Sequence, residues 1–152
     1  MAFDAFLKLD GISGESKDSK HKGEIEILSF SWGVSNSGRA CSVGGGGGEG
    51  KATFQDFSFV HRFDTASPQL MAHCANGKHI SEGTITVRKA GGEQTEFLKI
   101  RLDQILVSSS QAAGGGGSEP MEQVSLNFTK IEVTNTTTGE ASSFDVCAVR
   151  EQ

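Results

Sequence analysis

The chain has 152 residues, of which 36% are hydrophobic and 22% are charged, and its formal net charge at pH 7 is −5. These values predict one folded domain, spanning residues 1–152, with a hydrophobic core of its own. The acidic balance argues against a nucleic-acid partner, because phosphate contacts need clustered Lys and Arg, and no apolar run approaches the roughly 20 residues of a membrane span, so no membrane insertion is expected.

Alternating apolar and polar residues predict strands along much of the chain. The first strand is indicated by the alternation of Phe3, Ala5, Leu7 and Leu9. A later strand is indicated by Ile85 and Val87, which alternate with Thr84, Thr86 and Arg88. Such a pattern is typical of strands that bury one face and expose the other.

Four longer strands change the face of their apolar residues once. The phase shifts between Ile27 and Leu28, between Phe54 and Phe57, between Leu102 and Ile105, and between Phe128 and Ile131. A one-residue slip is typical of a β-bulge, which bends a sheet until it can close on itself. We therefore predict a mainly β fold, a small closed antiparallel β-barrel. An open sandwich whose strands cross between two sheets is the alternative, because it would show similar slips.

Two glycine-rich segments, at about 36–52 and 111–120, are predicted to be loops between strands. The first nearly matches the phosphate-loop pattern G-x-x-x-x-G-K-[ST], with Gly45, Gly50 and Lys51, but Ala52 lacks the hydroxyl that would bind magnesium. The flanking sequences also lack the preceding strand and following helix that aim backbone N–H groups at phosphates. We interpret the segment as a flexible connection, keep a nucleotide binder as the weakest alternative, and expect no cofactor.

One short helix is predicted near 67–76. Ser67 is a suitable N-cap, Pro68 fits the first helical position, and Gly77 stands where a helix commonly ends. The residues at helical spacing that we expect to pack on the outside of the barrel are Leu70, Met71 and Cys74.

The sequence marks out no catalytic or metal site. His73, Cys74 and His79 lie close together but lack metal-ligand spacing and a fourth ligand, and His21 and His61 are expected to be surface imidazoles. The serines at 108–110 are not in a G-x-S-x-G elbow. We therefore expect a protein that is not an enzyme, and a monomeric β-barrel that binds a small molecule in its interior is the alternative function.

Asp4 and Lys8 interrupt the N-terminal apolar stretch where a signal peptide needs continuity. The three cysteines are scattered and include no C-x-x-C pair, which fits a reducing compartment. We expect synthesis and folding in the cytoplasm.

The chain contains, in this order, the segments MAFDAFLKLDGISGESKDSKHKGEIEILSFSWGVS, QDFSF, ASPQL followed by CANGKHI, VRKAGGE, and LVSSS followed by a glycine-rich loop and VSLNF. Their order and spacing, from residue 1 to about residue 133, resemble the haemolysin-coregulated protein (Hcp) family, the tube subunit of bacterial type VI secretion systems. The resemblance covers nearly the whole chain.

The resemblance implies a β-barrel with one short flanking α-helix that assembles into a hexameric ring with an open channel. Such rings stack into the inner tube, which a contracting sheath drives beneath a spike. The implied partners are other copies of the chain, the sheath, spike and baseplate components, and small effector proteins carried in the lumen. The implied role has no cofactor or reaction, and the protein is secreted without a signal peptide.

The resemblance also assigns residues. Ser29 and Ser31 share one face of a strand associated with the channel wall, so they are implied to face the lumen and cargo; the alternative is that they face solvent or the adjoining subunit. The implied ring-stacking loop contains Gly44, Gly45, Gly46, Gly47, Gly48, Glu49 and Gly50.

The chain departs from the family pattern in its last strand, where it reads SSFDVCAVREQ with Phe144 and Asp145 in place of a Gly-Trp or similar pair. Cys41 and Cys147 also lie outside the pattern. The packing of the last strand and the contacts at the rim of the ring are therefore the parts that the resemblance predicts least.

Overall fold

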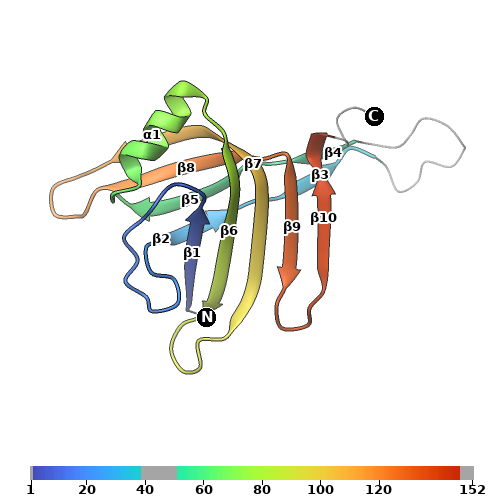
Figure 1. The fold of residues 1–152 in the computed structure, drawn as a ribbon, viewed down its shortest axis with the longest axis horizontal. Coiled ribbons are helices and arrows are strands. Elements are labelled where there is room, and N and C mark those ends of the chain that lie inside the picture. Colours follow the sequence, from blue (N-terminus) through green and yellow to red (C-terminus); the bar gives the residue numbers. More distant parts are fainter. Residues whose placement is uncertain (1, 39–50, 148–152) are drawn as a thin grey trace, which may run out of the picture.

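The computed structural model describes residues 2–38 and 51–147, and over these ranges it consists of strands with one short helix (Figure 1). The elements are β1 (Phe3–Leu9), β2 (Ile25–Ser31), β3 (Val34–Asn36), β4 (Ala52–Phe54), β5 (Phe57–Arg62), α1 (Ser67–Asn76), β6 (Ile80–Lys89), β7 (Glu96–Ala113), β8 (Met121–Asn127), β9 (Lys130–Asn135) and β10 (Ala141–Asp145). The predicted stacking loop, Gly44–Gly50, lies outside the described residues.

Six of the strands form a closed antiparallel barrel. The hydrogen-bonded order is β10-β9-β7-β6-β1-β2-β5-β8, and β8 also pairs with β7, which closes the ring of strands. Strand β7 can pair with both β9 and β8 because it is 18 residues long. Its first part pairs with β9 and its last part pairs with β8. The predicted closed barrel with a flanking helix is confirmed.

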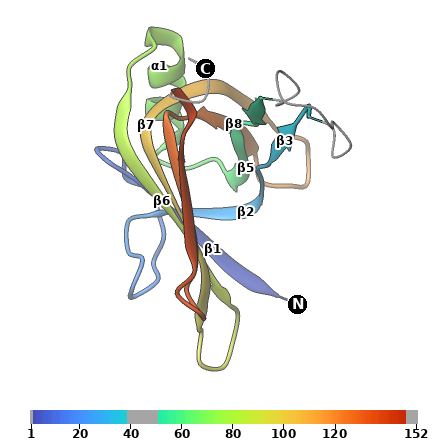
Figure 2. The ribbon, with the colours of Figure 1, turned by 90° about the vertical axis from the view of Figure 1, so that its right-hand side faces the viewer.

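The remaining strands of the described residues lie outside the barrel in two pairs, β9 with β10 and β3 with β4. Strands β9 and β10 extend the sheet beyond β7, and β3 and β4 form a separate hairpin at the edge of the molecule beside β10 (Figure 1). Figure 2 shows the sheet of β6, β7, β9 and β10 nearly edge-on, with β2, β5 and β8 to one side of it.

The four predicted phase shifts have different causes. In β2 the register with β5 shifts between Ile27 and Ser29, which is the predicted bulge. In β7 the shift coincides with Gln104, whose positive φ of 48° bends the strand where its partner changes from β9 to β8. The shifts after Phe54 and Phe128 are not bulges, because the chain leaves one strand there and starts another. An irregularity within a strand and a break between two strands both move the next side chain to the other face. The periodicity of the sequence therefore does not distinguish one from the other.

The helix occupies the predicted residues, Ser67–Asn76, and ends at Gly77 with left-handed backbone angles (φ 66°, ψ 24°). The assignment of Ser67 as N-cap is wrong, since Ala66 holds that position and makes no side-chain cap. The hydroxyl of Ser67 instead accepts a hydrogen bond from the Asp64 N–H at 3.1 Å, and the Asp64 carboxylate accepts one from the Ala66 N–H at 2.8 Å. Asp64 therefore organises the turn that starts the helix.

Only part of the predicted apolar face of the helix packs on the barrel. Leu70 is fully buried and Cys74 is partly buried against the core, as predicted. Met71 was expected to pack there too, but it is exposed. One face of this short helix contacts the barrel, and Met71 lies outside it because successive residues such as Leu70 and Met71 point about 100° apart.

The glycine-rich connection before β8 is shorter than predicted. Residues 111–113 were expected to be loop, but they continue the ladder between β7 and β8 as far as the pair Ala113 and Met121. The connection therefore comprises residues 114–120. At the other glycine-rich segment, the pair Asn36 and Ala52 closes the β3–β4 ladder at the predicted loop ends.

The interior of the barrel is filled by side chains that are almost completely buried. They include Leu7, Ile25, Phe57, Phe59, Ile85, Ile100, Leu102, Ile105 and Leu126. His61 lies among them, fully buried, so its prediction as a surface imidazole is wrong. This dense packing does not favour the alternative of a barrel that holds a small molecule inside.

A second buried layer lies outside the barrel, where residues 10–24 cover the outer face of β1 and β6. Phe6 stacks on His21 with ring centroids 4.5 Å apart, and the guanidinium of Arg88 lies 4.9 Å from the centre of the Phe6 ring. Arg88 also forms a two-point ion pair with Asp18, with Nη1 3.1 Å from Oδ1, which lowers the pKa of Asp18 to about 2. His21 and Arg88 are therefore buried. His21 was expected at the surface because it lies in a charged loop, and Arg88 because it alternates with Ile85 and Val87, so both expectations are wrong.

Candidate functional site

Ser29 and Ser31 lie on the outer face of β2, and both are exposed. Phe30, between them, turns inward and stacks on Phe57 with ring centroids 5.9 Å apart. The bulge after Ile27 sets this arrangement, because it moves the apolar series to even positions and leaves the serines facing out.

Ser31 begins a row of serines that crosses four strands. In the registers of the barrel Ser31 of β2 pairs with Ser58 of β5, Ser58 with Ser125 of β8, and Ser125 with Ser109 of β7. The hydroxyls of Ser58 and Ser125 are 3.0 Å apart and hydrogen-bonded. Only Ser31 of this row was identified from the sequence, since the other three join it through pairings between distant parts of the chain.

A second row runs parallel to the first, two residues along each strand. It contains Ser29, Val60, Gln123 and Gln111, which pair in the same order across β2, β5, β8 and β7. Side chains two residues apart on a strand point to the same side, so the two rows form one surface. We call these eight residues the serine–glutamine face. Val60 is its one apolar member, the others are serines and glutamines, and none of the eight is charged.

Asp56 anchors one end of this face. Its carboxylate accepts hydrogen bonds from the Ser108 hydroxyl at 2.6 Å and from the Asn127 amide at 3.0 Å. These contacts tie the corner between β4 and β5 to β7 and β8. The face is therefore held by side-chain bonds as well as by strand pairing, which favours a fixed surface over an adaptable one.

The side chains considered for catalysis or metal binding are not brought together. Among the described residues, no group of three or more His, Cys, Asp or Glu side chains is placed to hold a metal ion. His73 Nδ1 hydrogen-bonds the Gln69 carbonyl within its own helix at 2.8 Å. Ala52 begins a strand, not the helix that a phosphate loop requires, so the nucleotide-binding alternative is not supported.

A groove that the sequence did not reveal lies between the β3–β4 hairpin and strands β9 and β10. Its volume is about 690 Å³, and its walls include Trp32, Val34, Phe54, Val133 and Phe144. Phe54 and Phe144 face each other with ring centroids 5.8 Å apart. The one signal in the sequence was the unusual Phe144 in the last strand, but nothing there showed which residues it meets.

The six antiparallel strands that close on themselves, with one flanking helix and a separate hairpin, place the chain in the class of small closed antiparallel β-barrel proteins. No helix in the described part of the chain is long and apolar enough to cross a membrane. The family model of the type VI secretion system effector Hcp matches residues 6–135. The chain therefore belongs to the Hcp family, and the predicted family is confirmed.

Individual relatives agree with this assignment. The chain is 47% identical over 135 residues to protein hcp1 of Pseudomonas aeruginosa, covering 88% of this chain and 83% of the relative. The crystal structure of Hcp1 from Salmonella typhimurium superposes with a TM-score of 0.82 at 35% identity, over 97% of each chain. A type VI secretion system effector from Yersinia pestis gives a TM-score of 0.80 at 33% identity, over 94% of this chain and all of the other.

Proposed function

We propose that the chain forms hexameric rings that stack into the inner tube of a type VI secretion system, and that each ring carries small effector proteins in its lumen. The family identity supports the tube role. In this proposal the chain is a transport component without catalytic activity. It is made in the cytoplasm, joined there by sheath, spike and baseplate components, and exported by the system itself.

The serine–glutamine face is the observation that carries the proposal of a cargo-lining wall. Hydroxyl and amide groups form hydrogen bonds with many protein surfaces, and their desolvation costs far less than that of a charge. Because this wall carries no charge, it neither attracts nor repels a cargo protein according to the net charge of that cargo. Cargo held in this way binds weakly enough to be released, which suits a carrier.

The proposed wall is wider than the two serines implied by the resemblance. Ser58, Ser109 and Ser125 complete the row of Ser31 in register, so a bulky replacement in the middle of the row should act like one at its end. The hydroxyl pair Ser58–Ser125 lies at the centre of this surface.

The glycine-rich loop Gly44–Gly50 is proposed to mediate ring stacking. The hairpin that leads into it, β3–β4, lies at the edge of the molecule (Figure 1). Glycine permits backbone conformations closed to other residues, but ordering such a loop costs roughly 1–2 kcal/mol per residue. Stacking is then weak and reversible, and deleting Gly44–Gly48 should change the association of ring with ring.

The first test of the proposal is the native mass of the purified protein by light scattering after size exclusion, in reducing buffer. We expect a particle of about six times the 16.0 kDa chain. A monomer that persists at roughly tenfold higher concentration would overturn the ring.

The second test concerns the wall. Ser31→Gln and Ser125→Gln should each reduce co-purification of a co-expressed small type VI effector while the ring mass stays unchanged. Ser19→Gln is the matched control, because Ser19 is an exposed serine in the covering segment on β1 and β6. Equal effector recovery from all three variants would remove the cargo role of the face and leave the ring proposal standing.

A further inference from the structure

The surface of the serine–glutamine face continues into a third row of different chemistry. In the registers of the barrel Arg62 of β5 pairs with Met121 of β8, and Met121 pairs with Ala113 of β7. Each of the three lies two positions along its strand from a member of the second row, so its side chain points to the same side of the sheet. This row contains no hydroxyl and no amide side chain.

Met121 is the large apolar side chain that this surface exposes to solvent. It is 40% exposed. Among the described residues, six large hydrophobic side chains are exposed, and Met121 alone of these belongs to one of the four strands that build the face. Its exposure therefore needs an explanation that belongs to the face itself.

Two smaller apolar side chains flank Met121. Ala113 lies directly opposite it on β7 and is exposed. Val60 lies on the other side, because it is two residues before Arg62, the partner of Met121 on β5. Such diagonal neighbours are about 7–8 Å apart on adjacent strands, within reach of a long side chain. We call Val60, Ala113 and Met121 the apolar patch.

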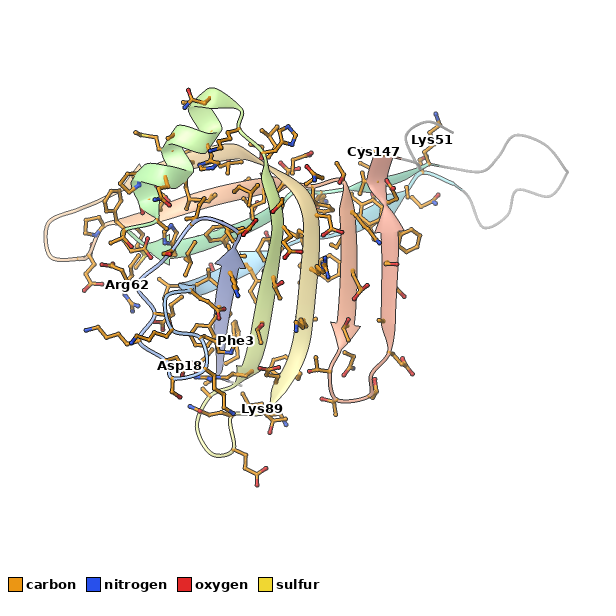
Figure 3. All side chains as sticks on the ribbon, in the orientation of Figure 1. Phe3, Asp18, Lys51, Arg62, Lys89 and Cys147 are labelled. Carbon is orange, nitrogen blue, oxygen red and sulfur yellow. The ribbon has the colours of Figure 1, made fainter. Side chains whose placement is uncertain are left out.

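The one charge in the third row is paired. Nε of Arg62 lies 2.9 Å from Oε2 of Glu119, in the connection before β8. Figure 3 shows Arg62 on the side of the molecule away from Lys51 and Cys147, so this ion pair marks the end of the surface that is remote from the β3–β4 hairpin. The apolar patch therefore lies between uncharged polar rows and a neutralised pair.

We propose that the apolar patch is a contact for carried effectors, and that it selects effectors whose surface exposes aliphatic or aromatic side chains next to hydrogen-bonding groups. The inference rests on the proposed carrier role. The polar rows can exchange hydrogen bonds with almost any protein surface, whereas the patch gains free energy only when apolar surface covers it. Methionine suits this contact, because its flexible thioether chain adapts to partners of different shape.

The position and the size of the surface both point to cargo as the occupant. The patch is continuous in register with the face that is proposed to line the lumen. With Met121 and Ala113 added, that face has ten residues, whereas a stable protein interface uses about 20–30 residues on each side. A contact of this size holds a protein weakly enough to release it.

Site-specific photo-cross-linking tests which part of the surface meets the cargo. The photoreactive residue p-benzoylphenylalanine replaces Met121, Gln123 or Met71 in separate chains, each co-expressed with a small type VI effector that wild-type rings retain. We expect covalent capture of that effector from positions 121 and 123. Position 71 is the matched control and should capture none, because Met71 is 63% exposed but lies on the helix, outside the face.

The outcomes separate the patch from the carrier role. Capture from position 123 but not from position 121 would overturn the patch and leave the wall standing. Capture of a second copy of the chain from position 121 would also overturn the patch, because that result would place Met121 in a joint between subunits. Capture from neither position, with the effector still co-purifying, would overturn both proposals.

Substitutions measure how much the patch contributes to retention. Met121→Gln keeps the length of the side chain and should lower effector recovery about fivefold at unchanged ring mass, the usual loss for one significant interface contact. Met121→Leu should lose far less, because it stays apolar, and Met71→Gln should match the wild type. Full recovery with Met121→Gln, while Ser31→Gln is still defective, would show that only the polar rows hold the cargo.

Discussion

Nε2 of His61 lies 2.8 Å from Oε1 of Glu122, and the two residues stand directly opposite each other on the inner face of β5 and β8. Both side chains are buried, and the other ring nitrogen of His61 lies 3.8 Å from Oδ1 of Asp64 at the start of the helix. The pair therefore joins the two barrel strands β5 and β8, next to the turn before α1. Polar contacts of this kind are costly to break because the remaining group stays buried without its partner.

Replacing Glu122 tests this contact. Glu122→Leu should lower the free energy of unfolding by about 1–3 kcal/mol, because it leaves His61 without its acceptor. Glu122→Gln should cost less, since the amide oxygen can still accept. Urea denaturation at one fixed protein concentration measures both, with Glu93→Gln in an exposed turn as control. A Glu122→Leu protein as stable as the wild type would show that the pair contributes nothing to folding.

The ion pair between Asp18 and Arg88 predicts a dependence of stability on pH. The hydrogen bonds from Arg88 lower the pKa of Asp18 in the folded state from 3.8 to about 2, so the carboxylate is favoured by folding. Its contribution is complete above the unfolded pKa and is lost as the pH falls from about 4 to about 2. The stability difference between wild type and Asp18→Asn should therefore be largest near neutral pH and shrink across that window. A difference that stays constant from pH 7 to pH 2 would contradict the assignment.

Asp56 is expected to hold the edge of the serine–glutamine face. Asp56→Ala removes the acceptor of both the Ser108 hydroxyl and the Asn127 amide, and should cost about 1–3 kcal/mol of unfolding free energy. It should also speed amide hydrogen exchange in the last part of β7, because the corner is no longer tied there. Asp56→Asn keeps one acceptor oxygen, so its unfolding free energy should lie between those of the wild type and of Asp56→Ala. Unchanged exchange in Asp56→Ala would mean that strand pairing alone fixes this end of the face.

Gly14 packs closely against the backbone at the point where the covering segment joins β2. A Cβ at this position would lie 2.6 Å from the Glu24 carbonyl oxygen and 2.8 Å from Cα of Ile25, and backbone atoms cannot move aside as side chains can. Gly14→Ala should therefore lower the unfolding free energy by about 1–3 kcal/mol. Gly115→Ala is the matched control, because a Cβ there has no neighbour within 4 Å. Thermal denaturation compares the two, and equal melting temperatures would show that the segment shifts without cost.

Local features of the chain were predictable because they depend on neighbouring residues. Pro68 and Gly77 bracket the helix at its observed bounds, since one is compatible with a first helical turn and the other with a left-handed end. The bulge after Ile27 was visible as a change of phase. The wrong details, such as the N-cap at Ser67, arose where a nearby side chain, that of Asp64, took the expected role.

Features that join distant segments were not predictable in this way. Alternation correctly gave β6 two faces, but it did not show that residues 10–24 cover the outer one, so the burial of Arg88 was missed. His61 was assigned to the surface because its hydrogen-bond partner, Glu122, is 61 residues away in the chain and no neighbouring residue indicates that pairing. In both cases the fold brings in a distant carboxylate, Asp18 for Arg88 and Glu122 for His61, and this polar contact offsets the cost of burying the side chain.

The sequence by itself determined the strands, the bulge, the short helix and the family, and it placed Ser29 and Ser31 on one face. These follow from side-chain periodicity, turn chemistry and recognisable segments, which are properties of continuous stretches of chain. The tertiary structure alone decided that the row of Ser31 continues through Ser58, Ser125 and Ser109, and that a groove opens between the β3–β4 hairpin and strands β9 and β10. The physical reason is that strand register is set by pairing between segments far apart in the chain, where each pairing selects which side chains share a surface.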